Sequence, residues 1–235
     1  RISHTTQQTD MLRIRPVFTT QTKHGELGLG GEMQYVDYED YIRNTSETEG
    51  LVSTMKGYQP ALYANYSSSY KQRLRYEVGI RYQGNLMDVK TMDVTNENKD
   101  WGFCPMVSLM YMANPQKGHI LSLQYKRMME ELPYSVISTY KQYESPQTYV
   151  VGNPALVSPT TDQLMAMIGL FNKITFMAGC VRVSNQIYYA TEIGPASSHV
   201  SYTIPRNGDS QTAFMFGLEG NVKPFKWWQM KANVN

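Results

Sequence analysis

The chain has 235 residues, of which 41% are hydrophobic and 18% charged, and its formal net charge at neutral pH is +2. This composition excludes a disordered chain, and the small net charge, without any run of Lys or Arg, gives no sign of nucleic-acid binding. The longest apolar run, residues 164–171, is far shorter than the roughly 20 residues of a transmembrane helix. If the chain enters a membrane, strands must cross it.

Apolar and polar residues alternate with a period of two along most of the chain, which predicts an all-β protein. Ten strands are expected, near residues 11–20, 27–38, 58–67, 73–86, 102–112, 119–128, 163–170, 174–189, 211–222 and 227–235. The fourth strand alternates most clearly. Its apolar face carries Val78 and Ile80, and its polar face carries Arg73, Arg75, Glu77 and Arg81.

The connections between these strands fall into two classes that alternate along the chain. The short ones are residues 21–26, 68–72, 113–118, 171–173 and 223–226, and the long ones are residues 39–57, 87–101, 129–162 and 190–210. An antiparallel up-and-down meander then has all its short turns at one end and its long loops at the other. This is the plan of an outer-membrane β-barrel, whereas a Greek-key sandwich has no reason to sort its loops in this way.

The alternation alone does not say which face points outward. A membrane barrel turns its apolar face to lipid and its charges to the lumen, and a soluble barrel does the reverse. The aromatic composition favours the membrane barrel, because 18 Tyr and 3 Trp stand against 7 Phe, and rings with a polar group suit a membrane interface. The candidates for interfacial girdles are Tyr35, Tyr38, Tyr41, Tyr58, Tyr188, Tyr189, Trp227 and Trp228. We therefore expect Val78 and Ile80 to face lipid and the polar set of the same strand to face the lumen.

Residues 121–190 carry a longer pattern: a strand ending in Lys126 and Arg127, then a proline, then a long loop with a tyrosine and a G-N-P-x-L-x-P element. The loop residues are Pro133, Tyr143, Gly152, Asn153, Pro154, Leu156 and Pro159, followed by Thr160, Thr161 and Gln163. The pattern resembles the outer-membrane β-barrel domain of Bacteroidetes TonB-dependent receptors. The acidic residue that the family has in the next strand is replaced here by Gln163 or Met165. Farther on, residues 217–219 and 226–228 resemble the family's G-x-E strand and K-W-W turn.

The resemblance implies an internal segment of a larger barrel, a single unit over residues 1–235 without the plug domain. It also implies contact with outer-membrane lipid, a plug domain and TonB in the full-length protein, and a possible surface lipoprotein partner. The implied location is the bacterial outer membrane, and the implied function is uptake of a glycan, a peptide or a metal chelate, with no cofactor and no catalysis.

Residue types that carry chemistry are scattered. His4, His24, His119 and His199 have no metal-ligand spacing and are interpreted as exposed turn residues, and Cys104 and Cys180 as unpaired packed thiols. Glycines at 25–31 fail the spacing of a nucleotide-binding loop and suit close packing within a strand. The acidic residues Asp37, Glu39 and Asp40 favour a solvated rim over a calcium site.

Two other functions remain open at this stage. An outer-membrane barrel enzyme, a protease or a lipase, needs about as many strands and should gather acidic and histidine side chains at the long-loop rim. A soluble β-rich binding protein is the third possibility, and it would not depend on detergent.

Overall fold

The computed structural model describes residues 3–44, 51–91, 94–194, 200–225 and 228–234. Nearly all of these residues are in strands. The elements are β1 (Ser3–Ile14), β2 (Val17–Gln21), β3 (Gly25–Asn44), β4 (Leu51–Tyr70), β5 (Leu74–Thr91), β6 (Val94–Asn114), β7 (His119–Met129), α1 (Tyr134–Ile137), β8 (Gln142–Ser145), β9 (Thr148–Val150), β10 (Thr160–Leu170), β11 (Ile174–Ser184), β12 (Ile187–Ile193), β13 (Ser201–Asn207), β14 (Gln211–Phe225) and β15 (Trp228–Val234). No helix within the described residues is long and apolar enough to cross a membrane.

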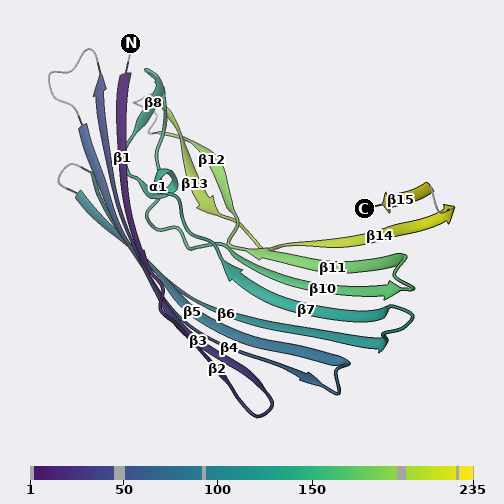
Figure 1. Ribbon diagram of the computed structural model, residues 1–235. Coiled ribbons are helices and arrows are strands. Elements are labelled where there is room, and N and C mark those ends of the chain that lie inside the picture. The colour runs from purple at the N-terminus through teal and green to yellow at the C-terminus, as the bar shows by residue number, and fades with distance from the viewer. Residues whose placement is uncertain (1–2, 45–50, 92–93, 195–199, 226–227, 235) are drawn as a thin grey trace.

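One large antiparallel sheet of 11 strands forms the body of the molecule, in the order β1-β3-β4-β5-β6-β7-β10-β11-β14-β15, with β2 also paired to β3. The sheet is strongly curved, like a segment of a barrel wall (Figure 1). It is open within the described residues, because β1 and β15 lie at its two edges. The predicted all-β meander is therefore confirmed.

The short turns lie together at one end of the sheet, as the sequence predicted (Figure 1). Lys71 and Gln72 join β4 to β5, and Phe171 and Asn172 join β10 to β11; all four have positive φ, as the tightest hairpin turns require. The ring of His119, at the start of β7, packs edge-on against Phe171 at 4.6 Å. His119 is therefore a packing residue and not the exposed turn histidine expected from the sequence.

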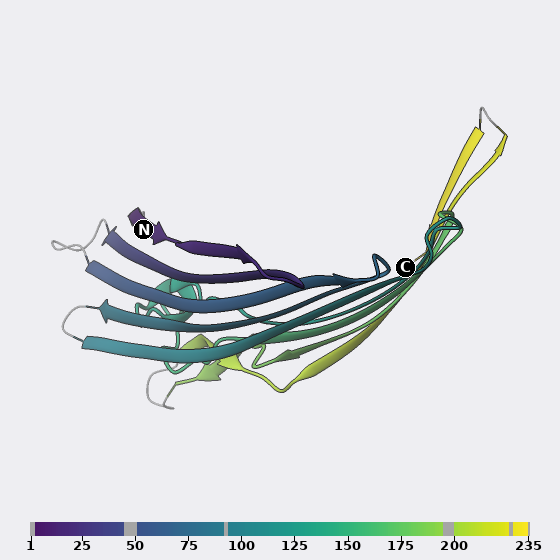
Figure 2. The ribbon, with the colours of Figure 1, turned by 60° about the horizontal axis from the view of Figure 1, so that its bottom comes forward.

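Two of the predicted long loops, 39–57 and 87–101, are wrong. The pairs β3–β4 and β5–β6 continue through most of these residues, with Asp40 opposite Ser53 and Val89 opposite Asn96. In Figure 2 these strands run on past the other strands to the far end of the sheet. Strands of 18 to 21 residues exceed the roughly 10 needed to cross a bilayer. The convex face of their far halves can therefore carry polar side chains such as Lys56 and Asp88, and the loss of an apolar convex face made these residues resemble loops in the sequence.

Two predicted strands are each divided. Residues 11–20 belong to β1 and β2, which pair with successive parts of β3 on either side of a break at Arg15 and Pro16. Residues 174–189 divide at Asn185, whose φ of 58° ends β11 before β12 begins in another sheet.

The connection from β7 to β10 is the longest between neighbouring strands of the large sheet in the described part of the chain, as predicted, and it is structured. It contains α1, β8 and β9, and the last two join β12 and β13 in a four-stranded sheet of order β12-β13-β9-β8. The buried hydrophobic cluster of the molecule lies where this connection meets β4 and β5, and it consists of Met55, Met87, Val89, Leu132, Val136, Ile137 and Leu156.

Candidate functional site

The long connection lies against the concave face of the large sheet (Figure 1). Gln83 donates a hydrogen bond to the carbonyl of Met129 at 3.3 Å, and Asn85 donates to the hydroxyl of Ser158 at 2.9 Å. Side chains alternate along a strand, so Arg81 shares the concave face with Gln83, while Val78 and Ile80 lie on the convex face. Both apolar side chains are exposed there, at 44% and 43%.

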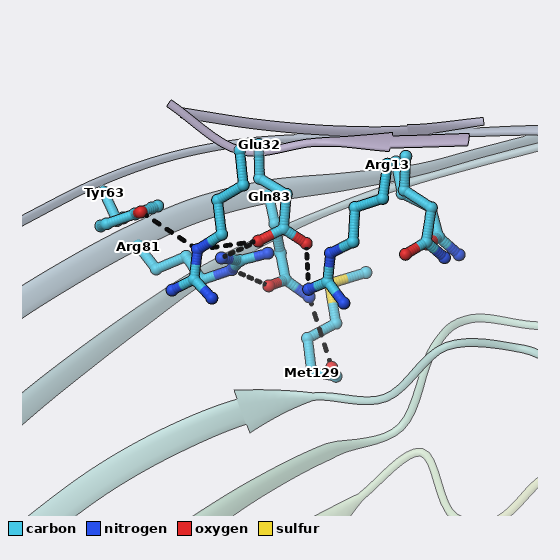
Figure 3. A network of polar contacts seen from close by, with 9 residues as sticks. Arg13, Glu32, Tyr63, Arg81, Gln83 and Met129 are labelled. Carbon is cyan, nitrogen blue, oxygen red and sulfur yellow. Dashed lines mark hydrogen bonds and ion pairs between the residues drawn. The ribbon is translucent and has the colours of Figure 1, made fainter. Parts of the chain in front are cut away.

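A network of charged and polar groups occupies the centre of the concave face, around Glu32 of β3 (Figure 3). Glu32 accepts hydrogen bonds from Arg13 at 2.5 Å and from Arg81 at 3.3 Å, and Arg15 lies 3.7 Å away. The Glu32 side chain is 5% exposed, whereas the arginines remain 32% to 55% exposed. One buried carboxylate thus holds three guanidinium groups on an open surface.

Tyr63 of β4 links two of these arginines. Its hydroxyl accepts from Arg15 at 3.2 Å, and the guanidinium carbons of Arg15 and Arg81 lie 5.4 and 5.9 Å from its ring centre. The ring lies across Gly30 of β3, where any Cβ would overlap it. This close approach agrees with the packing role that the sequence suggested for the glycines of this strand.

The polar residues predicted for one face of the strand at 73–86 lie in three different surroundings in the structure. Arg81 belongs to the central network. Arg75 and Glu77 lie near the short turns, where they line a polar hollow together with Glu26 and Ser67. Arg73 precedes β5 and lies in the β4–β5 turn, so it is not part of the strand.

The concave face of β6, β10, β11 and β14 differs in chemistry from the face around Glu32. The register places a set of thioether side chains on it: Met106, Met110, Met165, Met167, Met177 and Met215. Met167 and Met177 are direct cross-strand partners, and the sulfur of Met165 lies over Gly179. Between these strands, β7 places Ser122, Gln124 and Lys126 on the same face. This side of the concave face therefore combines thioether and polar side chains, which the sequence analysis did not predict.

The G-N-P-x-L-x-P element anchors the long connection to the concave face. Leu156 is 2% exposed within the hydrophobic cluster, and Asn98 of β6 donates to the carbonyls of Pro154 and Leu156 at 2.7 and 2.6 Å. The side chain of Asn153 donates to the carbonyl of Pro205 at 3.1 Å.

Gly152 passes directly over Ser138, at the end of α1. A Cβ at this position would overlap the Ser138 carbonyl oxygen, and the amide of Gly152 donates to that oxygen at 2.7 Å. Pro159 accepts from the amide of Glu130 at 2.9 Å and closes the base of the connection, while Pro133 caps α1. Tyr143 is 60% exposed on β8. These residues thus have structural roles, apart from Tyr143.

A row of side chains crosses one face of the small sheet: Tyr143, Tyr149, Tyr202 and Glu192 are successive cross-strand partners. Tyr149 and Tyr202 stack at 5.4 Å. Glu192 accepts from Tyr202 at 2.6 Å and from Arg206, and these two hydrogen bonds lower the pKa of the Glu192 carboxyl. The small sheet therefore presents tyrosines, and the ion pair of Glu192 with Arg206, at the long-loop end.

Aromatic pairs border the apolar band of the convex face. Tyr35 lies 5.2 Å from Tyr58, and Tyr82 stacks on Trp101 at 5.2 Å. The girdle prediction is wrong for some residues. Tyr38 lies on the concave face, 4.1 Å from Tyr134, and the other exceptions, Tyr188 and Tyr189, belong to the small sheet. Trp227 lies outside the described residues.

No group of three or more His, Cys, Asp or Glu side chains within the described residues could hold a metal ion. Cys104 is buried, and Cys180 is half-buried. Asp37 and Glu39 lie on the opposite face of β3 from Asp40, so the three acidic residues form no single site.

Comparison with known families agrees with this geometry. A model of an outer membrane protein beta-barrel family matches residues 2–235. The chain belongs to this family. It is accordingly a barrel segment of the bacterial outer membrane, the resemblance inferred from the sequence is confirmed at this level, and a soluble binding protein is excluded. Among proteins of curated function, none matches the sequence.

Solved outer-membrane receptors share the fold. The hemophore receptor HasR of Serratia marcescens, solved with its hemophore HasA and heme, aligns over 93% of this chain with a TM-score of 0.64 and 11% identity. The alcaligin receptor FauA of Bordetella pertussis aligns over 94% with a TM-score of 0.53 and 11% identity. The chain spans 40% and 37% of the length of these two receptors.

Proposed function

We propose that this chain forms part of the wall and the external loops of a receptor that takes up a nutrient across the outer membrane. The nutrient would be a glycan, a peptide or a metal chelate, and TonB would supply energy through a plug domain inside the barrel. The observation that carries the proposal is the connection of residues 130–159, which packs against the concave face and would narrow the lumen of the complete barrel from the outer end.

The methionines of the concave face support a filled lumen. A water-filled pore has a polar interior. The methionines of β6, β10, β11 and β14 would instead expose apolar surface to water, and flexible thioether side chains pack well against irregular partners. A plug domain seated on this side would cover them, and the arginines around Glu32 would face the passage that remains. The open sheet supports a larger barrel, of which this chain is one segment.

An enzymatic barrel is the competing function. It predicts acidic and histidine side chains gathered at the long-loop rim. The described rim instead presents tyrosines, with Glu192 engaged by Tyr202 and Arg206. This surface suits binding, whether of the nutrient or of a surface lipoprotein partner, and we propose that the chain has no catalytic activity.

Growth and uptake measurements test the proposal. A strain lacking the gene should lose growth on one class of nutrient, tested as the sole source of carbon, nitrogen or iron, and the complete gene should restore it. Uptake should stop when a protonophore collapses the inner-membrane gradient. Uptake that persists without the gradient would indicate a passive pore, and cleavage of the nutrient outside the cell would indicate an enzyme.

A further inference from the structure

The apolar band of the convex face ends, toward the long loops, in a border of charged residues whose sign differs along the sheet. On β1 and β3–β6 the border is acidic overall, with Asp10, Asp37, Lys56, Asp88 and Lys99. On β7, β10 and β11 it is basic, because Arg127, Asp162 and Arg182 are direct cross-strand partners. The second stretch therefore carries one positive charge in excess.

Within this basic stretch, Arg127 forms hydrogen bonds to Asp162 and Arg182 does not. Arg127 donates to both carboxylate oxygens of Asp162, at 2.8 and 2.9 Å, and the hydroxyl of Tyr125 donates to the same carboxylate at 2.6 Å. Arg182 makes no hydrogen bond or ion pair within the described part of the chain. Three hydrogen bonds thus engage Asp162, and Arg127 neutralises its charge. The exposed guanidinium of Arg182 has only a longer-range electrostatic attraction to the same carboxylate.

A shallow apolar hollow lies in the convex face. It is on the same strands as these arginines, closer to the short turns. The small residues Ala166 and Ala178 form its floor, and larger residues surround it, namely Ile168, Phe176, Phe216 and Leu218. Ala166 and Ala178 are each four residues from the charged border, which is about 13 Å at the rise of a strand. An anionic group at the border and an acyl chain in the hollow are therefore within the length of one lipid molecule.

We propose that β7, β10 and β11 bind a phosphorylated lipid of the outer leaflet. Arg182, with the remaining N–H groups of Arg127, binds the phosphate, and the hollow between β10, β11 and β14 receives an acyl chain. Guanidinium groups match phosphate geometry and bind it strongly at a membrane border. The acidic border of β1 and β3–β6 repels the same group, so the lipid is held on one side of the barrel. The site depends on the membrane location and not on the nutrient.

The experiment uses the complete receptor purified from outer membranes in detergent, with diphosphoryl lipid A, its dephosphorylated form and inorganic phosphate as probes. The wild-type receptor should bind diphosphoryl lipid A, and Arg182→Gln should weaken this binding by about tenfold or more, the loss of one charge-assisted contact. Arg182 is exposed and makes no hydrogen bond or ion pair within the described part of the chain, so the variant should fold normally. Lys99→Gln is the matched control, because Lys99 also lies at the convex border but is paired with Glu97.

A second variant tests the hollow separately. Ala178→Phe fills it and should weaken binding of the acylated lipid without changing the unfolding temperature of the receptor by more than the control does. Equal binding of diphosphoryl lipid A by wild type and Arg182→Gln would overturn the proposal. So would equal binding of the dephosphorylated lipid, or binding of inorganic phosphate as tight as that of the lipid, which would indicate an adventitious ion only.

Discussion

Replacement of Leu156 by Ala should release the long connection from the concave face without unfolding the barrel. Leu156 is 2% exposed and packs in the cluster with Ile137 and Val89, both of which are fully buried. Loss of a buried leucine side chain costs about 2 to 5 kcal/mol. The barrel strands keep their own hydrogen bonds, so this cost falls on the local opening of the connection. The open fraction should therefore rise by a factor of about 30 to several thousand.

Hydrogen exchange measured by mass spectrometry reports this opening directly. In the wild type, the amides of Gly152 and Asn153 donate to backbone carbonyls of the α1 segment and should exchange slowly. In Leu156→Ala they should exchange faster by the factor above, while the amides of β5 and β6 keep their wild-type rates. Val157→Ala is the control, because Val157 is 45% exposed. Unchanged exchange in the connection, or equal acceleration throughout the sheet, would refute the reasoning.

Three further perturbations follow from the same structure. Gly152→Ala places a Cβ against the backbone of Ser138 and should destabilise the docked connection by about 1 to 3 kcal/mol, seen again as faster exchange. The pKa of the Glu192 carboxyl, measured by NMR titration, should lie below 4.5, because the Tyr202 hydroxyl and the Arg206 guanidinium favour the charged form. The stability that this carboxylate contributes should be complete above pH 4.5 and should disappear as the pH falls through the lowered pKa. Tyr202→Phe should raise the titration midpoint. Val78→Arg should destabilise the folded barrel in lipid by about 2 to 4 kcal/mol, measured by urea titration.

The sequence was enough to predict those features of the fold that depend on the pattern of neighbouring residues. The alternation in residues 73–86 identified β5 and its two faces, and short polar segments identified the hairpin turns. It failed at residues 39–57 and 87–101, because strands that leave the bilayer lose the apolar face that marks them. Pairing across the sheet keeps these residues in strands, and pairing is not visible in one strand alone.

The central network could not be predicted, because it depends on strand register. Glu32 meets Arg13 and Arg81, which are 19 and 49 residues away. A shift of one residue moves a side chain to the other face. The resemblance placed the family's acidic strand residue at Gln163 or Met165, both of which lie on the concave face. The carboxylate that pairs with Arg127 is Asp162, on the convex face.

Site-directed labelling of two adjacent positions tests most directly whether the convex face contacts lipid. Single cysteines are introduced at Val78 and at Glu77 in a receptor whose own Cys104 and Cys180 have been replaced, and each variant is inserted in lipid bilayers. The cysteine at position 78 should react with a membrane-dissolved reagent and the cysteine at position 77 with a water-soluble one. The reverse pattern, or water access at both positions, would contradict the barrel orientation on which the proposed function and the lipid site depend.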